Sequence, residues 1–243
     1  MLGVAGQVFR YAVATGRCER DPSGDLRGAL TPHKPKNQSA VKPDELPDLL
    51  RAIASYHTIG DLQTELALGL LCLTFVRTNE LIGAEWSEFS DLEGKEPMWI
   101  IPAERMKMKA EHVVPLSRQA VAVVRQLRAL AGDSHYVLPG RNRDKPISNN
   151  TLLFALYRLG YKGKMTGHGF RAVASSILNE AGYRPDVIER QLAHTEPNKV
   201  RSAYNRAEYL PERRKMMQQW AEMVDAYARD ADVVPLNRKR ARA

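Results

Sequence analysis

Cysteine and long apolar runs are both scarce in this 243-residue sequence. Its two cysteines, Cys18 and Cys72, exclude a disulfide framework, and with six scattered histidines they cannot build a zinc module. The longest apolar run, residues 66–76, is far shorter than the roughly 18 residues that a membrane-crossing helix needs. Near the start, Arg10 interrupts the apolar segment, and the basic region of a secretion signal is missing. We therefore expect a cytoplasmic protein with no membrane partner.

Acidic residues are fewer than basic ones. The chain has 28 Asp and Glu against 36 Lys and Arg, so its formal net charge is +8. A soluble protein with this excess most often binds a polyanion, and nucleic acid is the commonest one. The alternative is an arginine-rich surface that water simply solvates. The charge therefore favours nucleic-acid binding but leaves that alternative open.

Proline and lysine gather in residues 31–43, which contain three of each. Proline removes backbone donors and restricts its neighbours, so this segment is predicted to be an extended basic linker. Before it, residues 1–30 contain one predicted amphipathic helix that ends at Gly16. After it, residues 44–229 are predicted to form the main domain. Residues 230–243 are basic without periodicity, which predicts a flexible tail.

The main domain is predicted to be mainly α-helical with a small three-stranded antiparallel β-sheet, an α+β fold. Short β-type runs separated by turn residues predict the strands at 86–89, 98–101 and 112–115. Apolar spacing and capping residues predict the helices, which are expected after Pro43, from Asp61 to about Phe75, after Ser117, after Ser148, and near 167–181, 185–193, 198–209 and 211–229.

Two positions in this pattern could bind an anion. His168 and Arg171 lie three residues apart where a helix is predicted to begin, so they share one face of its first turn. The free N–H groups and positive dipole of that end favour an anion, although such a pair is more often a capping histidine and a surface arginine. Arg77 directly follows an apolar helix. It is either a structural partner of Glu80 or a guanidinium that holds a phosphate through two hydrogen bonds.

Other polar residues carry weaker local signals. Lys107 and Lys109 lie in the turn between the second and third predicted strands. A lysine there is usually solvated but could reach over a groove as a mobile acid, and nothing local distinguishes the two. His194 ends a predicted helix. Tyr204, ten residues later, falls within an apolar i, i+3, i+4, i+7 pattern, so periodicity alone makes it a core tyrosine.

Taken in order, these residues form the series Arg, Lys, His-x-x-Arg, His and Tyr. This series resembles the tyrosine recombinase (phage integrase) family, and especially its prophage and genomic-island integrases. The resemblance covers about residues 39–226, and its most specific part is the run from Ala193 to Arg206. The family's hairpin lysine lies eight residues before the proline of a Val-Pro-Leu strand. Pro115 matches that proline and gives the role to Lys107, with Lys109 as the alternative.

The resemblance implies a chemistry on DNA. Tyr204, or less favourably Tyr209, would attack a backbone phosphate to form a 3′-phosphotyrosine, with no metal, ATP or other cofactor. The two arginines and His194 would hold the nonbridging oxygens, His168 would take the phenolic proton, and Lys107 would protonate the leaving 5′-oxygen. The implied catalytic residues are Arg77, Lys107, His168, Arg171, His194 and Tyr204.

The resemblance also implies partners. These are double-stranded DNA with an attachment site and further copies of the chain, as a tetramer on DNA and a monomer without it. Residues 1–30 would be the remnant of a core-binding domain, namely its last helix and exit. The predicted helix at 211–229 would pack against a neighbouring protomer, unless its apolar side covers its own core. That side consists of Met216, Met217, Trp220, Met223 and Val224.

Three other functions are alternatives. The first is a catalytically silent DNA-binding remnant of an integrase. The second is a stand-alone type IB topoisomerase, which shares the mechanism. The third is a metal-dependent nuclease, although its candidate ligands lack an i, i+4 pair or an adjacent acidic cluster. Those ligands are His33, His57, His168 and His194.

Overall fold

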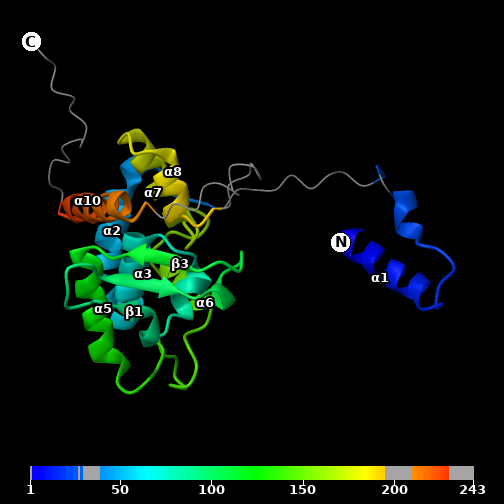
Figure 1. The fold of residues 1–243 in the computed structure, drawn as a ribbon, viewed down its shortest axis with the longest axis horizontal. Helices are drawn as coiled ribbons and strands as arrows, with labels where there is room; N and C mark the ends of the chain where they lie inside the picture. Colours follow the sequence, from blue (N-terminus) through cyan, green and yellow to red (C-terminus); the bar gives the residue numbers. More distant parts are fainter. Residues whose placement is uncertain (1, 27, 30–38, 195–208, 230–243) are drawn as a thin grey trace, which may run out of the picture. The chain divides into compact units, whose positions relative to one another are not determined.

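The computed structural model describes residues 2–26, 28–29, 39–194 and 209–229. The chain divides into two units, Met1–Asn37 and Gln38–Ala243 (Figure 1). In the first unit, α1 (Leu2–Ala14) is followed by the 3-10 helix η1 (Pro22–Leu26). The predicted N-terminal helix is thus confirmed. Within α1 only Gly6 is buried, as expected for a single helix that cannot form a core by itself.

The second unit combines helices with one small sheet. Strands β1 (Phe89–Ser90), β2 (Met98–Ile101) and β3 (His112–Pro115) form an antiparallel sheet in the order β1-β2-β3. The predicted fold class is confirmed. The α-helices are α2 (Leu46–Ala54), α3 (Leu62–Thr74), α4 (Thr78–Ile82), α5 (Arg118–Ala131), α6 (Asn150–Arg158), α7 (Gly169–Glu180), α8 (Pro185–Gln191) and α10 (Leu210–Ala228), and short 3-10 helices are η2 (Pro43–Glu45), η3 (Tyr56–Thr58), η4 (Trp86–Glu88) and η5 (Ala103–Arg105).

Two predicted helix starts are confirmed by their caps and one is wrong. The side chain of Asp61 accepts from Thr64 N at 2.8 Å, and that of Ser117 accepts from Ala120 N at 3.1 Å. In contrast, Asn149 rather than Ser148 is the N-cap residue of α6. The Ser148 hydroxyl lies 3.1 Å from Thr151 Oγ1, so it bonds to a side chain instead of the helix backbone.

The first strand is also shorter and later than predicted. Residues 86–88 form η4, and β1 contains only Phe89 and Ser90. The buried Glu88 explains the difference, because its carboxylate turns inward to accept from Trp99 Nε1 at 2.8 Å. The predicted helix at 198–209, apart from Tyr209, and the predicted tail at 230–243 lie outside the described residues.

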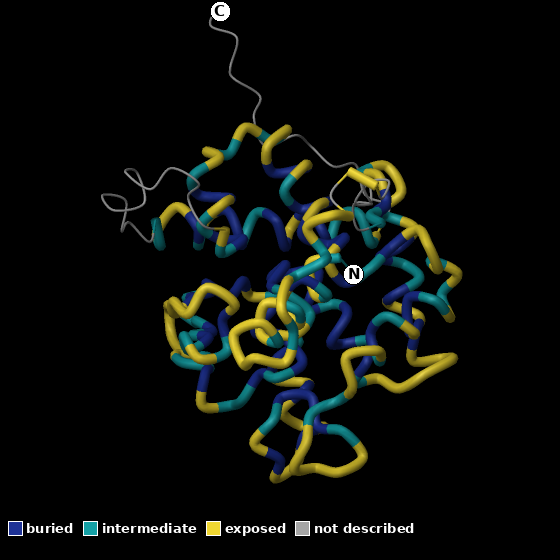
Figure 2. Tube along the Cα trace, turned by 90° about the vertical axis from the view of Figure 1, so that its right-hand side faces the viewer, coloured by how far each residue is buried: buried dark blue, intermediate teal, exposed yellow. Residues whose placement is uncertain are grey.

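Helix α3 forms the centre of the second unit. It is apolar on nearly every side, and α2, α5, α6, α7 and α10 all contact it (Figure 1). Such a helix must be buried all round, because no face of it suits water. Exposed residues are concentrated in the loops around this core (Figure 2). Because α3 is held on all sides, the residues that follow it, including Arg77, have a fixed position.

Helix α10 covers the core of its own chain. All five residues of its apolar side, from Met216 to Val224, are buried. The Trp220 ring meets Phe75 edge-on at 6.1 Å between centroids, and Trp220 Nε1 donates to Cys72 O at 2.9 Å. The expected alternative that this side covers its own core is therefore confirmed. Packing of residues 211–229 against a neighbouring protomer stays a prediction. None of the helices in the described ranges is long and apolar enough to span a membrane.

Candidate active site

Arg77 lies where α3 ends and α4 begins. Phe75 adopts a left-handed conformation, with φ of 40°, that turns the chain out of α3. Arg77 N then donates to Glu80 Oε2 at 2.8 Å, and Arg77 Nη1 donates to Glu80 Oε1 at 2.6 Å. The predicted pair with Glu80 is thus present. Because 24% of the Arg77 side chain stays exposed, the carboxylate orients a guanidinium that can still meet a ligand.

Arg171 is buried rather than on the surface. It lies in the first turn of α7, and only 3% of it is exposed. Its Nη1 donates to Phe75 O at 2.8 Å and its Nη2 to Leu192 O at 2.6 Å, whereas no described residue accepts from its Nε. Burial, and then the positive charge of Arg77, lowers the pKa of Arg171 to about 10, so it stays cationic at neutral pH.

Two glycines hold the start of α7 against the rest of the site. A Cβ on Gly167 would lie 2.3 Å from Thr78 Oγ1, and one on Gly169 would lie 2.7 Å from Ser39 O. Only glycine allows this close approach. The backbone around His168 consequently lies against the start of α4, directly after Arg77.

His168 is the N-cap residue of α7, so the helix begins slightly later than predicted. Its side chain is exposed, and its pKa is lowered by partial burial and then by its neighbours Arg171, His194 and Arg77. This common influence indicates that the four side chains gather in one place. The neutral imidazole is favoured there, which suits a proton acceptor.

His194 follows the end of α8. Ala193 adopts a left-handed conformation, with φ of 48°, and its carbonyl accepts from Arg77 Nη2 at 3.2 Å. His194 Nε2 lies 3.1 Å from Arg171 Nη2, and its Nδ1 lies 2.7 Å from Glu189 Oε2. A ring that donates from Nδ1 to Glu189 can accept from Arg171 through Nε2. Both arginines therefore bind the same short segment, Leu192 to His194.

The connection between β2 and β3 is bound to the end of α4 and to η4 through Arg105. Arg105, in η5, donates to the carbonyl of Glu80 and to the carboxylate of Glu88. Two residues further on, Lys107 is exposed, and none of the described side chains or carbonyls accepts from its ammonium. Lys109 Nζ instead donates to Glu104 O at 3.1 Å. The choice of Lys107 over Lys109 stays a prediction.

Of the two tyrosines, Tyr204 lies outside the described residues, so its predicted place at the site stays a prediction. Tyr209 is described and is the N-cap residue of α10. The guanidinium carbon of Arg184 lies 5.2 Å from the centre of its ring. The Arg184 guanidinium thus packs on the ring of Tyr209, and the choice of Tyr204 over Tyr209 stays a prediction.

Three buried polar residues near the site were not anticipated. His112, Gln191 and Arg213 are each 2% exposed or less. A signal for Arg213 was present, because it precedes Met216, Met217 and Trp220 by three, four and seven residues and thus shares their buried face. Gln191 follows Val187 and Ile188 in the same manner.

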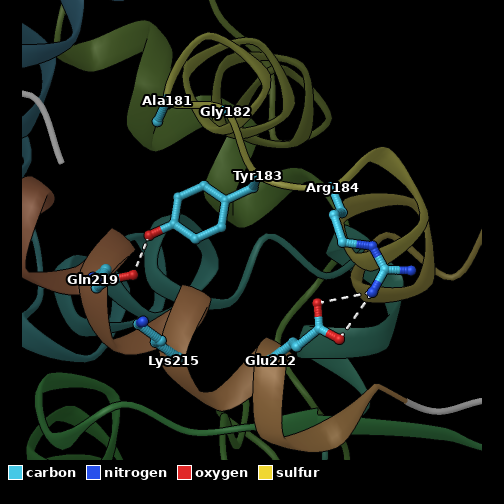
Figure 3. Close-up of a pocket in the computed structure, with 7 residues that line it drawn as sticks. All are labelled: Ala181, Gly182, Tyr183, Arg184, Glu212, Lys215 and Gln219. Carbon is cyan, nitrogen blue, oxygen red and sulfur yellow. Dashed lines mark hydrogen bonds and ion pairs between the residues drawn. The ribbon is translucent and has the colours of Figure 1, made fainter. Parts of the chain in front are cut away.

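A separate hollow of about 310 Å³ lies between the α7–α8 turn and α10 (Figure 3). Tyr183 donates there to the side-chain oxygen of Gln219, and Arg184 binds both oxygens of Glu212 at 3.0 and 3.1 Å. These polar groups already satisfy one another. Within the ranges that the structure covers, no group of three His, Cys, Asp or Glu residues is placed to hold a metal ion.

Comparison with known proteins gives a consistent result. Residues 39–210 match the phage integrase family, and residues 1–29 match the phage integrase central domain. The integrase of Enterobacteria phage P4 is 41% identical over 235 residues, which cover 90% of this chain and 52% of that protein. Prophage integrase IntZ of Escherichia coli (strain K12) is 43% identical over 222 residues, with coverages of 91% and 54%. The chain thus spans about half the length of these relatives.

Solved structures share the fold. A lambda integrase dimer bound to a COC′ core site has a TM-score of 0.58 at 17% identity, over 85% of this chain and 58% of that one. The XerA recombinase has a TM-score of 0.52 at 22% identity, over 78% of this chain and 66% of that one. With the match over residues 39–210 and two relatives above 40% identity, this chain belongs to the phage integrase family.

Proposed function

We propose that this chain carries the catalytic domain of a site-specific DNA recombinase that cuts and rejoins DNA through a 3′-phosphotyrosine. One observation supports this most. Arg77, at the start of α4, and Arg171, in α7, both bind the segment that ends in His194, and His168 lies within their electrostatic influence. Fixed cations gathered in this way stabilise the charge that grows on phosphate oxygens during substitution.

The first chemical step is an in-line attack by the Tyr204 hydroxyl oxygen on a DNA phosphorus. His168 accepts the phenolic proton, because partial burial and then the neighbouring positive charges lower its pKa and favour the neutral imidazole. Arg77 and Arg171 hold the nonbridging oxygens. The bond from phosphorus to the 5′-oxygen breaks, and Lys107 gives that oxygen a proton. Reversal of these steps rejoins the strand without ATP or a metal ion, since the phosphotyrosine conserves the ester bond.

The proposed partners follow from the family. The neighbouring structures include a lambda integrase dimer on a core site and a lambda integrase tetramer on a Holliday junction. We propose that this chain likewise binds double-stranded DNA at an attachment site and assembles as a tetramer there. The division into residues 1–30 from a core-binding domain, a linker at 31–43, the catalytic domain at 44–229 and a basic tail is part of the same proposal.

Covalent trapping tests the proposal. The protein is mixed with a pool of duplexes of random sequence, each nicked near its centre so that the cut strand cannot be rejoined. We expect a protein–DNA adduct that survives denaturation. Tyr204→Phe should abolish the adduct but leave DNA binding nearly unchanged, because only one hydroxyl is lost. Tyr209→Phe is the matched control and should still form the adduct.

The outcomes separate the alternatives. DNA binding without any adduct from the parent protein identifies a silent DNA-binding remnant. An adduct from Tyr204→Phe means that another residue is the nucleophile. Cleavage that EDTA abolishes indicates a metal-dependent nuclease. Adducts at many unrelated sequences, rather than at one recovered sequence, indicate a topoisomerase.

A further inference from the structure

A buried side-chain pair connects α8 and α10. Arg213, on α10, and Gln191, the last residue of α8, are both 0% exposed. Arg213 donates from Nε and Nη2 to Gln191 Oε1, at 3.1 and 2.8 Å. Such contacts are strong in a low-dielectric interior and leave little freedom to either side chain.

The two ends of this pair reach the backbone of two other elements. Gln191 Nε2 donates to Thr74 O, at the end of α3, at 3.3 Å. Arg213 Nη2 also donates to Val113 O, in β3. The pair therefore connects α3, α8, α10 and β3 at one buried point. Apolar packing also holds these elements together, but the hydrophobic effect is non-directional. Hydrogen bonds depend on distance and angle, so they constrain the relative positions of the elements more narrowly.

Each connection is close in sequence to a proposed catalytic residue. Thr74 comes three residues before Arg77, and Gln191 comes three residues before His194. Arg213 follows Tyr204 by nine residues, and Val113 follows Lys107 by six. The carbonyls that bind Arg171 belong to the residues directly after Thr74 and Gln191, namely Phe75 and Leu192.

We propose that the Arg213–Gln191 pair is a positioning unit for the recombination reaction. It holds the ends of α3 and α8 at the spacing that lets Arg77, Arg171 and His194 meet one phosphate, and it connects them to β3 and α10. This inference rests on the proposed function. A displacement of about 1 Å among catalytic groups can cost roughly 100-fold in rate, so the loss of this unit should slow cleavage.

The first test replaces both partners by apolar residues in the full chain, as Gln191→Leu with Arg213→Met. Removing both members of a buried polar pair is often nearly neutral for stability, whereas removing one leaves the other unsatisfied. Because Thr74 O and Val113 O lose their side-chain donors, we expect a lower melting temperature than in the parent. The loss should be larger in either single variant, which also leaves a buried polar side chain unsatisfied. Single-turnover formation of the adduct should fall by about 30-fold or more, while the Kd for the same nicked duplex stays within about threefold.

A second variant separates positioning from packing. Gln191→Glu keeps an oxygen that accepts from Arg213 but loses the N–H that donates to Thr74 O. We expect a folded protein whose adduct formation is at least about tenfold slower at nearly unchanged Kd. The control is Tyr56→Phe, which removes another buried contact, from Arg158 Nη1 at 2.7 Å, and should cleave at the parental rate.

The results distinguish this inference from the proposed function. If the parent traps DNA and both the double variant and Gln191→Glu trap it at the parental rate, the pair is only structural and the inference is overturned. A parallel loss of stability and rate in Gln191→Glu also overturns it. If the double variant unfolds, the Gln191→Glu rate decides. If the parent itself traps no DNA, the proposed function fails and this inference fails with it.

Discussion

Guanidinium groups that bind backbone carbonyls determine the geometry of the site at the scale of single residues. Arg171 binds Phe75 O and Leu192 O, and Arg77 binds Ala193 O. These contacts hold both cations in place before any ligand arrives, so the proposed reaction would need little reorganisation when charge develops on the phosphate. The difference in burial matters too. Arg77 is partly exposed and oriented by Glu80, whereas Arg171 is also a structural part of the core.

His112 allows a prediction about pH. It is 2% exposed, and its Nδ1 has no partner among the described residues. Burial, and then the positive charges of Arg213, Arg190, Arg171 and Arg77, lowers its pKa from 6.5 to about 3. Below pH 6.5, His112 therefore binds a proton in the unfolded chain but stays neutral in the folded chain until the pH approaches 3. His112 should cost about 2 kcal/mol of stability at pH 5 relative to pH 7, and the cost should grow towards pH 3.

Urea unfolding of the parent and of His112→Gln at pH 5 and pH 7 measures this effect. The parent should lose about 2 kcal/mol more than the variant between the two pH values. Other titrating groups contribute equally to both proteins and cancel in the comparison. Equal pH dependence of the two proteins would show that His112 is readily protonated in the fold.

Among the secondary-structure elements, α10 contacts both the core and the end of α8. Its apolar side lies on α3, and its first turns carry Arg213 to Gln191 at the end of α8. One helix therefore covers the core and also binds Gln191, the residue directly before the segment that both site arginines contact. Helix α10 has both contacts because it packs against α2, α3, α5, α8 and β3.

Trp220→Ala tests whether α10 belongs to its own core. The change leaves a cavity against Phe75 and removes the donor to Cys72 O, so we expect a loss of about 3–5 kcal/mol in the free energy of unfolding. The loss should be the same at two protein concentrations tenfold apart. The control is Phe154→Ala, which removes an aromatic ring that is 49% exposed and should cost far less. A concentration-dependent loss would instead indicate a subunit interface.

At the scale of the whole molecule, the buried core belongs to the second unit. Its cluster of buried apolar residues extends along the sequence from Val41 to Val224. The segment just before Val41 also contributes to the site, since Ser39 O accepts from Thr166 Oγ1 at 3.3 Å and lies close to Gly169. The second unit thus contains every contact that organises the described part of the site.

Two deletions test the contribution of the segment just before Val41. Deletion of residues 1–42 removes Val41, which is 6% exposed, together with the contacts of Ser39, whereas deletion of residues 1–37 keeps both. The longer deletion should therefore lower the free energy of unfolding by roughly 1.5–3 kcal/mol relative to the shorter one. Thermal and urea unfolding of the two truncated proteins provide the measurement. Equal stability of the two would mean that this segment adds little to the core.

Local patterns predicted most of the fold. Asp61 and Ser117 cap the helices that they were expected to cap, and the apolar run after Asp61 forms the central helix. These features depend on residues within one turn of each other, so the sequence contains the information directly. The cap at Ser148 was predicted wrongly because its hydroxyl bonds to the side chain of Thr151. The strand at 86–89 was predicted too early because the carboxylate of Glu88 turns inward to Trp99.

The sequence by itself determined the fold class, the helix caps and the order of the candidate residues. The tertiary structure alone decided that Arg171 is buried, that the apolar side of α10 faces its own core, and that Gln191 meets Arg213. The physical reason is distance along the chain. Arg171 is 96 residues from Phe75 and 21 from Leu192, so periodicity can show that a side chain faces the interior but not which carbonyl it meets there.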